Sequence, residues 1–138
     1  MKNLRRYVGI PFKDGGRDLS GLDCWGLVRL VWQEERGVVM PDMGDEYSSA
    51  FERGDVSGLF GKYTAQNWNV DVTDQPRREL DVLVFSFATL ELHAGLWIAP
   101  GEMLHVMRGM ETAIERYDVA KWAKRLSRVL RPAEDGHD

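Results

Sequence analysis

The stretch Gly21–Val28, with the sequence GLDCWGLV, most constrains how this chain folds and what it does. It holds the only cysteine of the 138 residues, Cys24, where a glycine-bearing loop gives way to a helical pattern. Apolar residues then recur at the spacing of one helical face, at Leu27, Val28, Val31 and Trp32. The spacing predicts a helix over residues 23–36 that packs one face against the rest of the domain.

The predicted helix places Cys24 on its first turn, with Asp23 or Ser20 as its cap and Gly37 as its stop. A helix N-terminus carries partial positive charge and unpaired amides, which stabilise a thiolate over a thiol. This is the environment of a nucleophilic cysteine. The alternative is a small buried hydrophobe, the usual state of a lone cysteine on an apolar helix face.

The second half of the chain is typical of β-strands. Residues 81–85 form a compact run with β-branched and aromatic residues, and residues 92–98 and 103–107 flank a Pro100–Gly101 turn, which predicts a hairpin. Further along, the pattern predicts a strand at residues 112–117 and a short helix at 118–124, begun by Asp118. A closing strand at 127–131 and a flexible tail at 133–138 follow.

The signal is weakest in the middle of the chain. Met40–Asp42 is typical of a turn and residues 48–60 of a short helix. Trp68 and Val70 are the expected anchors of this region in the core. We expect residues 48–78 to be a variable excursion, which either covers the functional site or only connects two parts of the fold.

Two of the three histidines, His93 and His105, lie on the two arms of the predicted hairpin. A three-residue loop at Ala99–Gly101 would place His105 opposite Gly95, with His93 as its diagonal neighbour at roughly 7–8 Å between backbones. A loop of even length would turn the two rings to opposite faces. Gly95 leaves room for a ring, which favours the odd loop.

A thiolate, a histidine and a second polar group that orients the histidine make a site for acyl transfer. Cys24 would attack a carbonyl carbon, His93 would pair with Cys24 and protonate the leaving amine, and His105 would orient His93. Backbone amides at the helix start would contribute to an oxyanion hole. Two alternatives remain: the histidines are ordinary half-buried side chains, or the three residues bind a catalytic zinc, although their spacing matches no known metal motif.

Length and charge narrow the class of protein. A chain of this length suits one domain, residues 1–138, with a core that needs neither disulfide nor metal. Its formal charge of −4 and scattered basic residues argue against a nucleic acid partner. It has no apolar run long enough for a membrane span, and residues 1–6 lack the apolar stretch of a signal peptide. We expect synthesis in the cytoplasm.

Four stretches together resemble the NlpC/P60 family of cysteine peptidases. They are residues 7–16 (YVGIPFKDGG), 21–28 (GLDCWGLV), 81–85 (DVLVF, against the family's GDLVFF) and 93–97 (HAGLW, against HVGIY). His105 stands at the place of the family's third polar residue, in a segment like G-x-x-I-H. Leu80 replaces the glycine that usually opens the strand motif. The resemblance spans most of the chain and leaves residues 48–78 unaligned.

The resemblance implies an α+β, papain-like NlpC/P60 fold, in which the cysteine-bearing helix packs on an antiparallel β-sheet that carries both histidines. It implies a catalytic Cys24–His93–His105 triad, supported by Asp23 and Trp25, with no metal or other cofactor. The expected activity is that of an endopeptidase on peptidoglycan stem peptides, typically between D-glutamate and the diamino acid. The DCWGLV variant and small size look most like the phage and prophage tail-associated subgroup, which implies tail proteins as partners and delivery to the cell wall in a tail.

Phe12 departs from the resemblance. The family often has tyrosine at this position, where the hydroxyl helps at the oxyanion site, and phenylalanine has no hydrogen bond to donate. Loss of one oxyanion donor costs roughly 10²–10³ in rate. Tyr7, Tyr47 or a backbone amide is the expected substitute. The alternatives are a weakly active or non-catalytic tail assembly module, or an amidase or acyltransferase that acts on another substrate.

Overall fold

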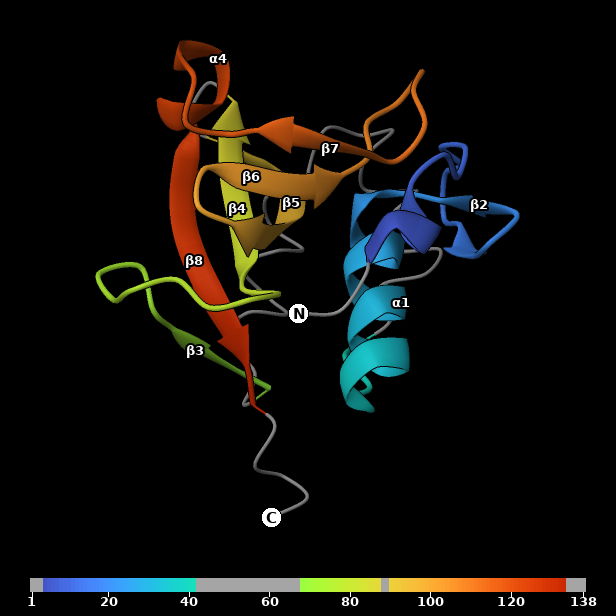
Figure 1. Ribbon diagram of the computed structural model, residues 1–138, viewed down its shortest axis with the longest axis horizontal. Helices are drawn as coiled ribbons and strands as arrows, with labels where there is room; N and C mark the ends of the chain where they lie inside the picture. Colours follow the sequence, from blue (N-terminus) through green and yellow to red (C-terminus); the bar gives the residue numbers. More distant parts are fainter. Residues whose placement is uncertain (1–3, 42–67, 88–89, 134–138) are drawn as a thin grey trace.

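A single long helix, α1 (Cys24–Arg36), stands beside a sheet in the computed structural model, which describes residues 4–41, 68–87 and 90–133 (Figure 1). The Asp23 side chain caps the helix by accepting a hydrogen bond from the backbone N–H of Gly26. Gly37 ends it in the left-handed conformation, with φ of 67°, and its N–H donates to the carbonyl of Gln33. The predicted helix, its cap at Asp23 and its stop are confirmed.

The sheet has six strands in the order β3-β8-β4-β5-β6-β7, and every neighbouring pair is antiparallel. A short helix, α4 (Ala120–Ala123), joins β7 to β8. The strands are β3 (Asn69–Asp71), β4 (Val82–Phe87), β5 (Leu90–Ala99), β6 (Glu102–His105), β7 (Ala113–Arg116) and β8 (Leu126–Pro132). The N-terminal part adds the 3-10 helix η1 (Leu4–Tyr7) and a two-stranded sheet of β1 (Arg17–Asp18) and β2 (Gly21–Leu22). The predicted α+β architecture is confirmed.

Each face of the sheet carries its own apolar cluster, because successive side chains of a strand point to opposite faces. On one face, α1 packs against β5, and the buried cluster joins Val31 of the helix to Val84 and Leu96 of the strands. On the other face, a smaller cluster gathers around Trp122 of α4 and Phe85 of β4. Within the described ranges, no helix has the length and apolar character needed to cross a bilayer.

The β5–β6 hairpin reaches the expected side-chain parity by a different route. Ala99 pairs with Glu102 across a two-residue turn, Pro100–Gly101, where the sequence analysis expected a three-residue loop. A bulge between Trp97 and Ala99 adds the odd residue, so that Leu96 pairs with Leu104. The same register places Gly95 opposite His105, as expected. A Cβ at Gly95 would lie 3.2 Å from the Cβ of His105, so the glycine does make room for the ring.

Three other expectations change. Val70 is 58% exposed, because β3 is an edge strand, whereas Trp68 does pack on the core with its ring 5.5 Å from that of Trp25. Asp118 does not cap α4, since its carboxylate binds the guanidinium of Arg116 instead. β3 belongs to the sheet, although it falls within the stretch expected to be an excursion. The predicted helix at 48–60 lies outside the described residues, as do the predicted turn at 40–42 except for Met40 and Pro41 and the predicted tail at 133–138 except for Ala133.

Leu80 is the one described non-glycine residue with positive φ, at 73°. Its N–H donates to the carbonyl of Trp97, and its carbonyl accepts from the indole N–H of Trp32, so the strained backbone is held from both sides. Its side chain is buried in the cluster beneath α1. This burial explains why an apolar residue is tolerated where the strand motif usually has glycine.

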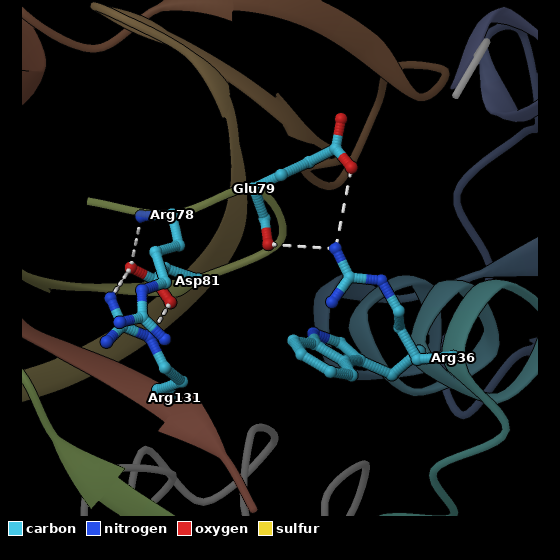
Figure 2. A pocket seen from close by; sticks show the side chains of 6 residues that line it. Arg36, Arg78, Glu79, Asp81 and Arg131 are labelled. Atoms are coloured by element: carbon cyan, nitrogen blue, oxygen red, sulfur yellow. Dashed lines mark hydrogen bonds and ion pairs between the residues drawn. The ribbon is translucent and has the colours of Figure 1, made fainter. Parts of the chain in front are cut away.

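A cavity of about 190 Å³ lies at the C-terminal end of α1, between the helix and the start of β4 (Figure 2). The buried carboxylate of Asp81 binds Arg131 through two contacts of 2.8 Å, and Arg36 approaches Glu79 at 3.4 Å. Arg36, which lines this cavity, lies twelve positions after Cys24 along the helix, or about 18 Å at 1.5 Å per residue. These ion pairs join α1 and β8 to the turn before β4, at the opposite end of the helix from the cysteine.

Candidate active site

Asp23 fixes the start of α1 and therefore the position of Cys24. Its carboxylate is fully buried and accepts hydrogen bonds from the backbone N–H of Gly26 at 2.7 Å and of Gly15 at 3.0 Å. It also binds Arg17 of β1 at 2.8 Å. Burial raises the pKa of Asp23, against the opposing charge of Arg17. One carboxylate thus joins the helix start, the glycine loop and β1.

Two glycines allow this close packing. A Cβ at Gly26 would lie 2.0 Å from the carbonyl oxygen of Gly16, and a Cβ at Gly16 would lie 2.2 Å from the carbonyl oxygen of Gly21. Neither backbone oxygen can move away without breaking the loop. The glycines on both sides of Cys24 therefore hold the loop against the first turn of α1.

The two histidines meet on the sheet as the hairpin parity predicted. His93 on β5 and His105 on β6 are buried, and Nε2 of His93 lies 2.9 Å from Nδ1 of His105. Phe85 and Trp122 pack against them, with the Trp122 ring 5.3 Å from His93 and 5.2 Å from His105 between centroids. The two imidazoles therefore form one hydrogen-bonded unit in an apolar setting.

A third strand extends this unit through a residue that the sequence analysis missed. Nε2 of His105 lies 2.7 Å from Oε1 of Glu115 on β7, and the indole N–H of Trp122 donates to Oε2 of Glu115 at 3.1 Å. The register explains the contact, because Glu115 pairs with Met103 and is thus a diagonal neighbour of His105. Alternation along residues 113–116 indicates only that Glu115 shares a face with Ala113, and the pairing of Ala113 with His105 in the structure makes this the histidine face.

Burial sets the charge state of the unit. Burial, with the neighbouring His105, lowers the pKa of His93 to about 3. Burial also lowers the pKa of His105, against the opposing effect of Glu115. Burial acts to raise the pKa of Glu115, but hydrogen bonds from His105 and Trp122 hold this pKa below its ordinary value. At pH 7 the unit therefore holds two neutral rings and one carboxylate.

Cys24 is the first residue of α1, the helix that packs against β5. Its side chain is buried, and it belongs to the same cluster as Ala94, which follows His93 on β5. Of the amides in the first turn, Gly26 and Leu27 already donate to Asp23, so these two cannot serve an oxyanion. Trp25 is buried and its indole N–H donates to the carbonyl of Pro41 at 2.7 Å, which anchors the chain beyond α1.

The structure excludes one of the side chains expected to replace a tyrosine hydroxyl at position 12 as oxyanion donor. The Tyr7 hydroxyl lies 2.9 Å from Glu34 and 2.7 Å from Glu35, near the far end of α1, so it does not replace the missing donor. Tyr47 lies outside the described residues. The ring of Phe12 lies beneath the guanidinium of Arg108, 5.2 Å from its centroid.

The ring nitrogens of His105 bear on the zinc alternative. One bonds to His93 and the other to Glu115, so His105 has no ring nitrogen left for a metal. In the part of the chain that the structure describes, no group of three or more histidine, cysteine and carboxylate side chains is arranged to hold a metal ion. The geometry of the pair favours a proton-transfer role over a ligand role.

Comparison with known proteins decides the family. The model of the NlpC/P60 family matches residues 9–131, which include α1, both histidines and Glu115. The chain belongs to the NlpC/P60 family. Its helix on an antiparallel sheet is the architecture expected of a member.

Two relatives of this NlpC/P60 chain each match 95% of it. Gamma-DL-glutamyl hydrolase of Bacillus subtilis (strain 168) is 24% identical over 134 residues, and murein DD-endopeptidase MepS/murein LD-carboxypeptidase of Escherichia coli (strain K12) is 21% identical over 131. The chain spans 28% of the length of the first relative and 60% of the second. Both relatives are thus longer proteins that contain a similar domain.

Solved structures share the fold. The NlpC/p60 domain of the peptidoglycan hydrolase SagA is 19% identical, with a TM-score of 0.59 over 91% of this chain and 90% of that domain. RipD of Mycobacterium tuberculosis, described as a non-catalytic NlpC/p60 domain protein, is 17% identical, with a TM-score of 0.57 over 91% of this chain and 87% of RipD. The family fold therefore occurs in proteins described as hydrolases and in one described as non-catalytic.

Proposed function

We propose that this protein is a cysteine endopeptidase that hydrolyses amide bonds in peptidoglycan stem peptides, at the bond between D-glutamate and the diamino acid. The observation that carries the proposal is the buried hydrogen bond between His93 on β5, the strand that packs against the cysteine-bearing helix, and His105 on the neighbouring β6. The two relatives are named as a glutamyl hydrolase and a murein endopeptidase, and these activities support the substrate class.

In the proposed mechanism, Sγ of Cys24 attacks the carbonyl carbon of the scissile amide. Nε2 of His93 is engaged by His105, so Nδ1 is the nitrogen that accepts the thiol proton and then gives it to the leaving amine. Water, deprotonated by the same nitrogen, then hydrolyses the thioester and releases Cys24. The low pKa of His93 favours a neutral thiol–imidazole pair before attack over the ion pair expected from the sequence.

The test compares wild type with Cys24→Ala on purified sacculi and on a defined γ-D-glutamyl-diaminopimelate peptide under reducing conditions. Wild type should release stem-peptide fragments, and Cys24→Ala should release none while keeping the same circular dichroism spectrum and thermal midpoint. Wild type that cleaves neither substrate refutes the proposal. Cleavage of another amide or ester alone would identify an amidase or acyltransferase on this fold.

We also propose that the protein is made in the bacterial cytoplasm and reaches the wall as part of a phage or prophage tail. The DCWGLV variant at Cys24 supports this, because it is most similar to the tail-associated subgroup. The protein should then co-purify with tail proteins in intact phage particles, where an antibody raised against it should detect it. Particles that lack it would contradict the proposal.

Phe12 favours a second candidate, a tail module that keeps the fold and binds the wall without cutting it. The position offers no hydroxyl, and the hydroxyl of Tyr7 is held at Glu34 and Glu35. Under this candidate, wild type and Cys24→Ala would sediment with sacculi equally and neither would release fragments.

A further inference from the structure

Glu115 is the outermost member of a hydrogen-bonded series that runs across β5, β6 and β7. We propose that Glu115 is a positioning residue that fixes the tautomers of both histidines, so that Nδ1 of His93 is the bare nitrogen that can accept the proton of Cys24. The tautomer assignment stands on the geometry of the series. Only its use by Cys24 rests on the proposed peptidase function.

Counting donors and acceptors gives the assignment. A carboxylate can only accept, so Nε2 of His105, 2.7 Å from Oε1 of Glu115, must carry a hydrogen. A neutral imidazole has one N–H, which leaves Nδ1 of His105 as an acceptor. Nε2 of His93, 2.9 Å away, must then be the donor, and Nδ1 of His93 is bare. A single carboxylate thus dictates the position of two protons.

The carboxylate is itself held in place. The indole N–H of Trp122 donates to Oε2, which leaves Oε1 for His105. The ammonium of Lys121 lies 5.4 Å above the Trp122 ring and favours the ionised form of Glu115. The ring of Trp122 also packs against both imidazoles, so neither ring can rotate by 180° without disturbing the cluster around Trp122.

Glu115→Gln should reverse the direction of the hydrogen bonds along the series, although the side chain keeps almost the same volume. The indole N–H of Trp122 still requires an acceptor, so the amide oxygen should face Trp122 and the amide NH₂ should face His105. His105 must then carry its hydrogen on Nδ1, and His93 must carry its own on Nδ1 as well. Glu115→Ala supplies neither donor nor acceptor and leaves both tautomers accessible. The isosteric variant should therefore be the more damaging of the two.

The experiment reads the ring nitrogens directly by ¹⁵N nuclear magnetic resonance at pH 7. A His137→Gln background leaves only the signals of His93 and His105. Wild type should show hydrogen on Nε2 and bare Nδ1 in both rings, Glu115→Gln the reverse, and Glu115→Ala values between the two. Glu102→Gln is the matched control, because it removes the same charge from β6 at a partly exposed position outside the hydrogen-bonded series and should leave both tautomers unchanged.

Kinetics provides the second readout. Glu115→Gln should lower kcat by about 100-fold or more with little change in KM, since a wrong tautomer in a serine-protease triad costs about 10⁴. Glu115→Ala should lose less. Wild-type tautomers retained in Glu115→Gln, or in Glu115→Ala if the first variant fails to fold, would overturn the proposal. Reversed tautomers in a protein that cleaves nothing would uphold the proposal and refute the peptidase function.

Discussion

Acidification should destabilise this protein through His93, whose pKa is lowered to about 3 from an ordinary value of 6.5. The unfolded chain protonates His93 near pH 6.5, whereas the folded chain resists protonation until about pH 3. The unfolded state therefore binds more protons between these values, and stability falls as the pH falls through that window. Above pH 6.5 the effect vanishes. At pH 5 the loss is about 2 kcal/mol, from the ratio of the two protonation equilibria.

Urea unfolding at pH 7 and pH 5 measures this loss, which corresponds to a midpoint lower by about 1 M for an m-value near 2 kcal/mol/M. Other groups titrate as well: the lowered pKa of His105 acts in the same direction, and the raised pKa of Asp23 acts in the opposite one. His93→Gln is the control, because it keeps these groups and removes the ring. The difference between the two proteins isolates His93. Equal losses in wild type and His93→Gln would refute a buried, neutral His93.

Three further predictions follow from local geometry. Leu80→Gly should be more stable than Leu80→Ala by about 1 kcal/mol in urea unfolding, because both lose the buried side chain but only alanine keeps the strain of positive φ. Arg131→Met should lower the free energy of unfolding by about 3–5 kcal/mol in urea unfolding, since it leaves the buried carboxylate of Asp81 unpaired (Figure 2). Arg36→Met should lower it by only about 0–1 kcal/mol, because it breaks a partly exposed ion pair with Glu79. Phe12→Tyr should raise kcat on the glutamyl peptide by about 10-fold or more by supplying a hydroxyl donor, and an unchanged kcat would place the oxyanion donors elsewhere.

Local signals predicted α1 well, because its determinants are short-range. An aspartate three residues before the N–H that it caps, an apolar stripe and a glycine at the end specify one helix almost independently of the rest of the chain. Asp118 shows where such signals fail. It is an equally good cap by composition, but Arg116 two residues away captures its carboxylate.

The hairpin shows how a correct parity can come from an incorrect loop. A proline–glycine pair fits a two-residue turn, and an even loop alone would separate the histidines. The bulge between Trp97 and Ala99 restores the alignment. Gly95 was the informative residue, because the need for space beside a ring depends on which residue lies opposite and not on how the turn is made.

The candidate site was predictable as far as pairs of residues and no further. His93 and His105 belong to consecutive strands, so only the loop length and a possible bulge in one hairpin decide whether they meet. Glu115 lies one strand farther on, beyond a loop whose length sets no parity that sequence alone reveals, and its second oxygen is fixed by Trp122 of α4. Each added strand increases the number of possible registers. The proton positions depend on all three residues of the series together, so they could not be predicted from any one pair. Under the proposed function, the orientation of the base is therefore a property of the folded sheet, and it is set by Glu115 at the outer end of the hydrogen-bonded series.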